Sequence, residues 1–267
     1  MKTTLTIGAA IAALTLAGCA TPAPKYDPES DLGLLWVKHS AEYKAVAATV
    51  YHAATRDLPK FKRDPSWDAL RGPGERSALP PAVILDIDET VVSNVDFQLT
   101  FERPFENHKL DTWSSNYNSL AIPGVVSFVD IARTLSVTVF FVTNRPCQPK
   151  EGTDDPCPQK QTTIDDIREL GIDVDAEHVM LSGERPGWGK EKLTRREYVA
   201  QTHRVIMLIG DDFSDFVPCS REKPAGPCTE AATRESRAAQ LEKYKDFWGN
   251  GWYILPNPMH GSWTSVR

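Results

Sequence analysis

The chain has 267 residues, of which 41% are hydrophobic and 25% are charged. These values fit one sizeable globular unit with a full hydrophobic core, and they exclude a disordered chain and a chain that lies in the membrane throughout. The formal net charge of −6 argues against binding of a nucleic acid polymer through overall charge, because phosphate backbones call for clustered Lys and Arg.

The first 19 residues differ from the rest of the chain. Lys2 gives a basic start, residues 5–16 form an apolar stretch, and the stretch closes on LAGC, which ends at Cys19. It is shorter than the roughly 20 residues of a bilayer span, and small residues before a cysteine are typical of a lipoprotein signal. We expect a signal peptide over residues 1–18 and a lipid anchor at Cys19. An ordinary secretory signal with an incidental cysteine is the alternative.

The next segments predict a tether and then a helical region. Residues 19–30 carry three prolines and several polar residues, which is typical of a tether. From residue 31 to about 56, apolar side chains recur at helical spacing, which predicts one or two helices. Residues 59–81 are rich in Pro, Gly and charge, and we expect them to wind over the surface. This divides the chain into a helical N-terminal or cap region (31–81) and a larger core (82–267).

Four short apolar runs follow, with helical stretches between them: residues 82–85, 137–142, 178–181 and 205–209. Buried parallel strands read as continuous apolar runs rather than as alternating ones. The order of elements therefore predicts an α/β fold, with a Rossmann-like parallel sheet flanked by helices. Ligands of such sheets bind beyond the carboxyl ends of the strands.

Besides Cys19, the chain has four cysteines in two close pairs within Pro-rich loops: Cys147 with Cys157, and Cys219 with Cys228. An exported protein meets an oxidising compartment, so two short-loop disulfides are the simplest interpretation, although sequence does not prove the pairing. A zinc site is the rival. It ranks lower because neither pair has Cys-x-x-Cys spacing or nearby His ligands.

Polar groups suited to phosphate chemistry follow three of the predicted strands. The first strand ends in DIDET (86–90), the second in TNR (143–145) and the last in GDD (210–212). Carboxylates directly after an apolar strand are costly to desolvate unless they are paired or bound to a metal. Asp86 alone would be explained as a cap or turn residue, but three such groups together indicate a functional site.

The order Asp-x-Asp-x-Thr, Thr-Asn, Lys and Gly-Asp-x-x-x-Asp, within residues 82–216, resembles the haloacid dehalogenase (HAD) superfamily. More narrowly, DIDETVVSN, FVTNR, KLTRREYV, GDDFSDF and LPNPMHGSW are similar to segments of the bacterial class C acid phosphatases, a family of outer-membrane lipoproteins. The resemblance implies a HAD-like core and magnesium-dependent hydrolysis of small phosphate monoesters at acidic pH, with 5'-nucleotides as one expected substrate class.

The resemblance also implies roles for the acidic residues. Asp86 would attack phosphorus and carry a transient aspartyl phosphate. Asp88 would protonate the leaving oxygen and later activate water, for which we expect a pKa raised by the acidic cluster. A cation must offset the repulsion of phosphate, and Mg²⁺ would bind the Asp86 and Asp211 side chains and the Asp88 backbone carbonyl. Asp212 or Asp215 would orient waters; an asparagine is expected at position 212, so this division stays open.

Other positions would contact the phosphoryl group. Thr143 and Asn144 would donate hydrogen bonds to its oxygens, and a lysine would neutralise the developing charge. Lys192 fits this role better than Lys190, because the resemblance implies Lys-x-x-Arg-Arg, which KLTRR matches from Lys192 onward.

Aromatic residues are candidates for a wall that stacks on a nucleobase or an aryl ring, with core packing as the equal alternative. The candidates are Trp113, Tyr117 and Trp188. His108 and His260 are weaker candidates for the pocket edge. The segment PNP (256–258) resembles a family hallmark, and we expect it to fix a closing loop.

The leading hypothesis is thus an exported phosphomonoesterase. Ala20 lacks the aspartate associated with inner-membrane retention, so we expect an outer-membrane location in a bacterium with two membranes. Phosphotransfer on the same scaffold is an alternative, whereas Asp88 argues against a dehalogenase. A noncatalytic ligand-binding surface lipoprotein is a further alternative that loss of the nucleophile would favour, but Asp86 is intact.

Overall fold

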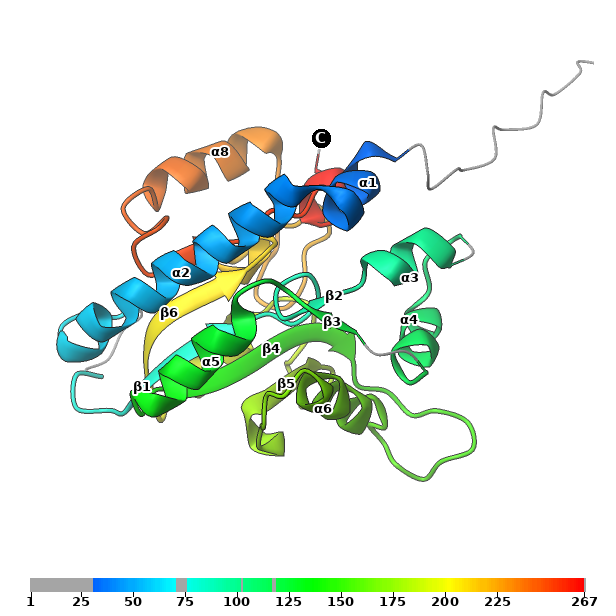
Figure 1. Cartoon of the computed structure of the whole chain (residues 1–267), viewed down its shortest axis with the longest axis horizontal. Coiled ribbons are helices and arrows are strands. Elements are labelled where there is room, and N and C mark those ends of the chain that lie inside the picture. Colours follow the sequence, from blue (N-terminus) through cyan, green and yellow to red (C-terminus); the bar gives the residue numbers. More distant parts are fainter. Residues whose placement is uncertain (1–30, 71–75, 102, 117–118, 267) are drawn as a thin grey trace, which may run out of the picture.

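The computed structural model describes residues 31–70, 76–101, 103–116 and 119–266 (Figure 1). The expected signal peptide, the tether, Cys19 and Tyr117 lie outside these described residues. Within them, no helix combines the length and the apolar character that crossing a bilayer requires.

Five parallel strands form the central sheet, in the order β5-β4-β1-β6-β7. They are β1 (Pro81–Leu85), β4 (Thr138–Pro146), β5 (Val179–Ser182), β6 (Arg204–Gly210) and β7 (Trp252–Ile254). The first four confirm the strands predicted from the apolar runs, and with them the α/β fold class. The edge strand β7 was not predicted, because three residues are too few for a recognisable apolar run.

Alternating side chains along each strand enter two hydrophobic cores, one on each face of the sheet. In β1, Val83 and Leu85 belong to one core, whereas Ala82 and Ile84 belong to the other. Both faces are therefore covered, which explains why the strands contain continuous apolar runs rather than alternating apolar and polar residues.

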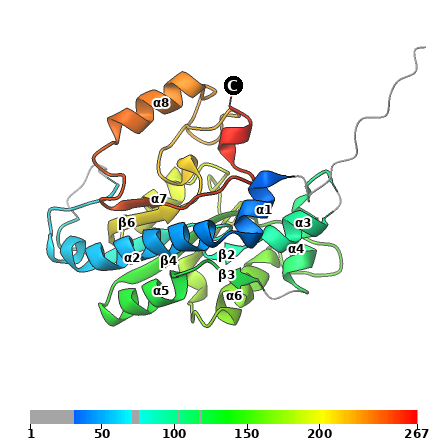
Figure 2. The ribbon, with the colours of Figure 1, turned by 45° about the horizontal axis from the view of Figure 1, so that its top comes forward.

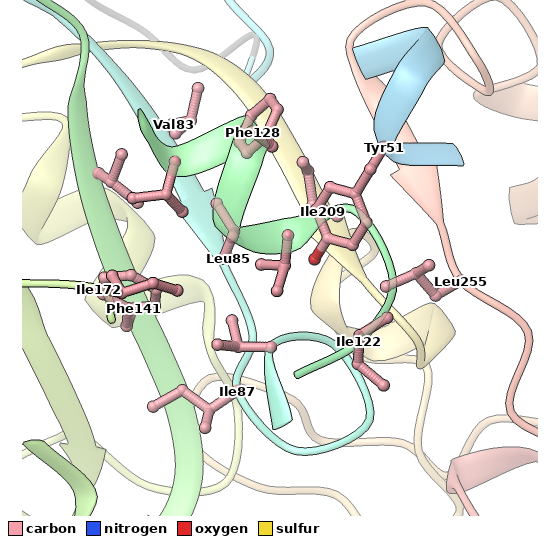
Figure 3. Packing of buried hydrophobic residues seen from close by; sticks show 14 of the residues in the cluster. Tyr51, Val83, Leu85, Ile87, Ile122, Phe128, Phe141, Ile172, Ile209 and Leu255 are labelled. Carbon is pink, nitrogen blue, oxygen red and sulfur yellow. The ribbon is translucent and has the colours of Figure 1, made fainter. Parts of the chain in front are cut away.

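Helices close the first core. They are α2 (Ala41–Arg63), α5 (Val125–Thr134) and α6 (Gln159–Glu169). In Figure 1, α2 and α5 run beside each other across the sheet. Tyr51 of α2 and Phe128 of α5 have ring centroids 5.7 Å apart and lie in the same core as Leu85 and Ile209 (Figure 3). The second core contains Val199 of α7 (Leu193–Val199) and aromatic side chains from the C-terminal third of the chain.

The N-terminal periodicity forms two helices, α1 (Leu32–His39) and α2. α2 passes through Pro59 and ends at Arg63, so the expectation that residues 59–81 wind over the surface is wrong for its first part. Trp67 stacks on Phe61 with ring centroids 4.6 Å apart, and its indole N–H donates to the Ile206 carbonyl at 2.9 Å. Packing on the sheet thus outweighs the helix-breaking tendency of Pro59.

A small substructure follows β1. The strands β2 (Val92–Ser93) and β3 (Leu120–Ala121) pair antiparallel, and between them in sequence lie α3 (Val95–Thr100) and α4 (Asn107–Ser114). Figures 1 and 2 show α3 and α4 close together beside the sheet, where α3 contacts α1 and α4 contacts α6. The last helix, α8 (Arg234–Lys243), precedes β7.

The four cysteines form the two expected short-loop disulfides, Cys147–Cys157 and Cys219–Cys228. Cys147 directly follows β4, whereas Cys219 lies further along the loop that follows β6. These two disulfides rule out the alternative of a zinc site, because none of the four cysteines has a free thiol to bind a metal.

Candidate active site

The carboxyl ends of β1, β4 and β6 open into one cavity of about 600 Å³. The three predicted strand-end groups all contribute to its lining: Asp86 and Asp88, Asn144 and Arg145, Asp211 and Asp212. The lining also includes Phe101 and Phe105, which lie between α3 and α4 in sequence. Adjacent parallel strands bring together residues that are more than a hundred positions apart in sequence.

Three carboxylates form a compact cluster in this cavity. One oxygen from each of Asp86, Asp211 and Asp215 lies within 4.8 Å of the others. The Lys192 ammonium, 3% exposed, donates to Asp86 and lies 2.7 Å from an oxygen of Asp215. Among the described residues, Lys192 is thus the direct cationic partner of a cluster of three carboxylates. Asp215 is itself a member of this cluster, whereas sequence analysis had placed it where it would only orient waters.

Burial controls the protonation of the cluster. Desolvation raises the pKa of Asp86 to about 7; Lys192 opposes this rise, and the charges of Asp215 and Asp88 add to it. Desolvation also raises the pKa of Asp211 well above its ordinary value, with repulsion from Asp86 and Asp215 in support. A cation among these oxygens would relieve both effects.

Asp88 differs from expectation. Burial would raise its pKa, but Arg145 lowers the pKa below its ordinary value by charge and by hydrogen bonding. Nε and Nη2 of Arg145 lie 3.0 and 2.8 Å from Asp88 Oδ1, and the Asn94 amide donates to the same oxygen at 2.9 Å. The predicted rise was wrong because it counted only the acidic neighbours. It did not consider the Arg145 guanidinium, which is 57 positions away in the sequence.

Asp212 is turned away from the carboxylate cluster. Its side chain caps the short helical turn Phe213–Asp215 by accepting from the Ser214 N–H at 2.9 Å, and it accepts from the Ser262 hydroxyl at 2.7 Å. Burial opposes ionisation, yet these hydrogen bonds lower the pKa of Asp212 to about 2. The residue thus fastens the C-terminal loop to the end of β6.

Asp211 is held by two neutral donors. The Thr90 hydroxyl donates to its Oδ1 at 3.1 Å and the Asn257 amide to its Oδ2 at 2.7 Å. The Tyr51 hydroxyl of α2 in turn donates to the Thr90 carbonyl at 2.7 Å. The segment PNP therefore does more than close a loop, since Asn257 contacts an acidic residue of the site.

Glu89 directly follows Asp88 in the turn after β1, and it is 1% exposed. Its backbone is in the left-handed region, with φ of 61°, and its carboxylate accepts from the Asn94 N–H at 2.8 Å. The His260 imidazole lies 2.9 Å from the same carboxylate, which raises the pKa of His260 although burial acts to lower it. Sequence analysis gave Glu89 no role; the available signal is a further acid directly after Asp88, in the turn that follows an apolar strand.

The second strand-end group lies beside the acidic cluster. The Thr143 hydroxyl is 3.4 Å from Asp88 Oδ2 and also accepts from the Arg145 N–H at 3.0 Å. The Asn144 side-chain oxygen accepts from Arg195 at 2.9 Å, and Asn144 lines the cavity. Arg195 is fully buried and also donates to the Thr143 carbonyl, which fixes this strand end.

The two lysines occupy different environments. Lys192 is buried against Asp86 and Asp215, whereas Lys190 is exposed on the rim of the cavity. Between them, Glu191 is 3% exposed and accepts from the Leu193 N–H at 3.3 Å and the Cys219 N–H at 3.1 Å. Glu191 thereby joins the Lys192 segment to the loop of the second disulfide.

The aromatic candidates take other places than the expected wall. Trp188 is buried in the second core, with Tyr198 at 5.2 Å between ring centroids, and so does not face the substrate. Trp113 packs against Phe97 at 5.8 Å and is not among the described residues that line the cavity. The described aromatic lining comes instead from Phe101 and Phe105.

The two candidate histidines lie in different places. His260 lines the cavity, whereas the exposed His108 pairs with Glu106 at 3.3 Å outside the described cavity lining.

The acidic cluster fits a divalent metal. Its donors are carboxylate oxygens alone, the ligand type that hard cations such as Mg²⁺ and Ca²⁺ prefer. Their oxygens converge on one point, and the buried negative charge exceeds the compensation that Lys192 supplies.

Comparison with known proteins agrees with this geometry. The family model for the HAD superfamily, subfamily IIIB (Acid phosphatase), matches residues 29–263. The structure of the class C acid phosphatase from Bacillus anthracis is 25% identical, with a TM-score of 0.65, and the match covers 86% of this chain and 84% of that chain. The structure of that enzyme with tungstate bound gives 27% identity, the same TM-score and the same coverage.

Proposed function

Because the chain belongs to subfamily IIIB of the HAD superfamily, the acid phosphatases, and is therefore a phosphomonoesterase, we propose that it hydrolyses its substrates through an aspartyl phosphate on Asp86. The observation that carries this proposal is the placement of the Asp86 carboxylate. It is buried at the end of β1, contacts Lys192, and faces the cavity beside two further carboxylates.

In the first half-reaction, an Asp86 oxygen attacks phosphorus as the bond from phosphorus to the leaving oxygen breaks. Asp88 must enter this step protonated, and because Arg145 lowers its pKa, this form is populated only at acidic pH. It gives its proton to that leaving oxygen, and the alcohol departs. Lys192, already 2.7 Å from Asp215 and in contact with Asp86, offsets negative charge on the phosphoryl oxygens. Thr143 and Asn144 donate hydrogen bonds to the same oxygens from the end of β4.

In the second half-reaction, Asp88 takes a proton from water, and the water oxygen forms a bond to phosphorus. The bond between phosphorus and Asp86 breaks, which releases phosphate and restores the carboxylate. Once Asp88 has given up its proton, the ion pair with Arg145 stabilises it as a carboxylate, the form that this step requires.

Asp86, Asp211 and Asp215 would hold the metal ion, together with the Asp88 backbone carbonyl. When bound, Mg²⁺ would supply positive charge that permits a phosphate dianion to approach the acidic cluster. Thr90 and Asn257 would keep Asp211 oriented, and Asp212 would act on the site only by fixing the neighbouring loop.

The substrate is a small phosphate monoester, and the cavity size supports an aryl or nucleoside leaving group. A volume of about 600 Å³ is ample for such a group, and Phe101 and Phe105 supply apolar surface in the same cavity as the acidic cluster. We include 5'-nucleotides in the substrate class on this basis.

We further propose that the protein is exported and anchored to the outer membrane through Cys19. The support is the sequence that ends in LAGC, together with two disulfides, which form and persist in oxidising compartments. Labelling with a radioactive fatty acid should mark the wild-type protein and leave C19A unmarked. Labelling of C19A would contradict the anchor.

The enzymatic proposal is tested by phosphate release from 4-nitrophenyl phosphate and a 5'-nucleotide, with Mg²⁺ or with a chelator, for wild type and D86N. We expect turnover that needs the metal and is lost in D86N. Turnover that survives both the chelator and D86N would refute the mechanism. Absence of turnover on every ester would favour a binding lipoprotein, and transfer to an added alcohol would favour a phosphotransferase.

A further inference from the structure

Asp166 of α6 is a buried acid that no step of the proposed reaction uses. It is 3% exposed, and its Oδ2 accepts from the Ser114 hydroxyl at 2.7 Å and from Nη1 of Arg145. Asp166 is not among the described residues that line the cavity. Any effect of this residue on the reaction must therefore pass through its two partners.

Arg145 connects Asp166 to Asp88. Its Nη1 donates to Asp166, while Nε and Nη2 lie 3.0 and 2.8 Å from Asp88 Oδ1. A guanidinium is planar, and its donors are fixed relative to one another. Fixing the Nη1 end therefore sets the plane of the whole group, and with it the direction from which the Asp88 carboxylate is held.

Ser114 connects the same carboxylate to the cavity wall. It is the last residue of α4, it is buried, and it lines the cavity with Arg145. A continuous chain of hydrogen bonds thus runs from α4 through Asp166 and Arg145 to Asp88. The chain joins four separate segments of the sequence: α4, α6, the end of β4 and the turn after β1.

We propose that Asp166 is a positioning residue: through Arg145, it orients the Asp88 carboxyl group toward the leaving oxygen. The hydrogen bond from Ser114 makes this orientation depend on the position of α4. The inference rests on the proposed role of Asp88 as proton donor. Proton transfer needs heavy atoms about 2.6–3.2 Å apart. If the Arg145 guanidinium were free to tilt, the Asp88 carboxyl group that it holds would lie within this distance of the leaving oxygen in fewer of the bound complexes.

The test measures kcat/KM for phosphate monoesters from 4-nitrophenyl phosphate to simple alkyl phosphates. This parameter reports the first half-reaction, in which a poor leaving group needs the proton and 4-nitrophenolate hardly does. We expect D166A to lower kcat/KM for alkyl phosphates about tenfold more than for 4-nitrophenyl phosphate. S114A should also lower kcat/KM more for alkyl phosphates than for 4-nitrophenyl phosphate, but the difference should be smaller than in D166A.

Matched controls come from the neighbouring residues. Asp165 and Ser115 are exposed and make only local hydrogen bonds, to Gln161 and to the Asp111 carbonyl. D165N and S115A should therefore follow the wild type across the whole series. If D166A does not fold, D166N keeps the size of the side chain while removing its charge, and it should show the same selective loss to a smaller extent.

The parallel variant D88N separates this inference from the proposed function. A selective loss in D88N with a uniform loss in folded D166A would overturn the role of Asp166 and leave the mechanism intact. A uniform loss in D88N would refute the proton donor itself. In the double variant D88N/D166A, we expect no more than about a twofold further loss relative to D88N, because both changes act on one step. Full additivity would contradict the inference.

Discussion

At the scale of single residues, the site is defined by which charges have partners. Lys192 contacts two carboxylates, Arg145 contacts two others, and the Asp211 carboxylate is held by neutral donors. Each acid thus has a distinct electrostatic environment although four of them stand within one cavity. Different environments are what allow chemically identical side chains to take different roles.

The contrast between the two lysines gives the first residue-scale prediction. K192A should lower kcat by about 10²- to 10³-fold, because it removes the cation beside the nucleophile. The matched variant K190A should leave kcat within about threefold of wild type and act on KM, since Lys190 lies on the exposed rim. Steady-state kinetics on 4-nitrophenyl phosphate measures both, and a larger kcat effect in K190A would reverse the assignment.

Asp212 gives a prediction about stability and pH. Its hydrogen bonds to Ser214 and Ser262 hold the pKa at about 2 in the folded protein, below the ordinary value near 4. A lowered pKa means that the stabilisation is complete above about pH 4 and is lost as the pH falls toward 2. D212N should therefore lower the free energy of unfolding by about 2 kcal/mol at pH 6, and by less at pH 3.

Denaturant unfolding of wild type, D212N and the exposed control D246N at both pH values checks this. A D212N deficit that is equal at pH 6 and pH 3 would show that the ionised carboxylate does not carry the stabilisation.

At the scale of elements, four strands of the sheet could be predicted because each contains a continuous apolar run, and three of these runs are followed by a motif. Asp86, Asn144 and Asp211 meet in the structure because they follow adjacent parallel strands, which the sequence order already indicates. The partners of these residues were not recoverable. Arg145 and Asp88 are 57 positions apart, and no local pattern predicts their contact.

Local sequence was misleading at two places. Asp212 stands next to Asp211 in the chain, yet the helical turn at Phe213–Asp215 directs it to Ser262. Trp188 lies in a glycine-rich segment near Lys192, yet it fills the second core. In both cases the direction of the side chain depends on tertiary packing, which residue type and spacing do not determine.

Helix α2 is tied to the site by one hydrogen bond, and this gives an element-scale prediction. Y51F removes the donor to the buried Thr90 carbonyl, so we expect a loss of about 1–3 kcal/mol in the free energy of unfolding. Because the Thr90 hydroxyl holds Asp211, kcat should fall as well. The control Y253F removes a hydroxyl that also bonds α2, at Asp57, but away from the site. It should cost stability without changing kcat; equal kcat in both variants would contradict the coupling.

At the scale of the whole molecule, the residues of the site come from segments spread from the end of β1 to the C-terminal segment. β1 and β6 supply the acids, β4 supplies phosphoryl contacts and Arg145, α3 and α4 stand over the cavity, and the C-terminal segment supplies Asn257 and His260. The N-terminal helix α2 shares the first hydrophobic core with the sheet. Folding and assembly of the site are therefore expected to be a single event for residues 31–266.

The central claim is that Asp86 becomes phosphorylated, and the most direct measurement is the capture of that state. Wild type should be mixed with 4-nitrophenyl phosphate and Mg²⁺, quenched in acid within milliseconds, digested and mapped by mass spectrometry. The peptide that contains Asp86 should carry the mass of one phosphoryl group, which hydroxylamine removes, and D86N should carry none. A phosphoryl group on another residue, or turnover by D86N with an unmodified wild-type peptide, would contradict the proposed mechanism.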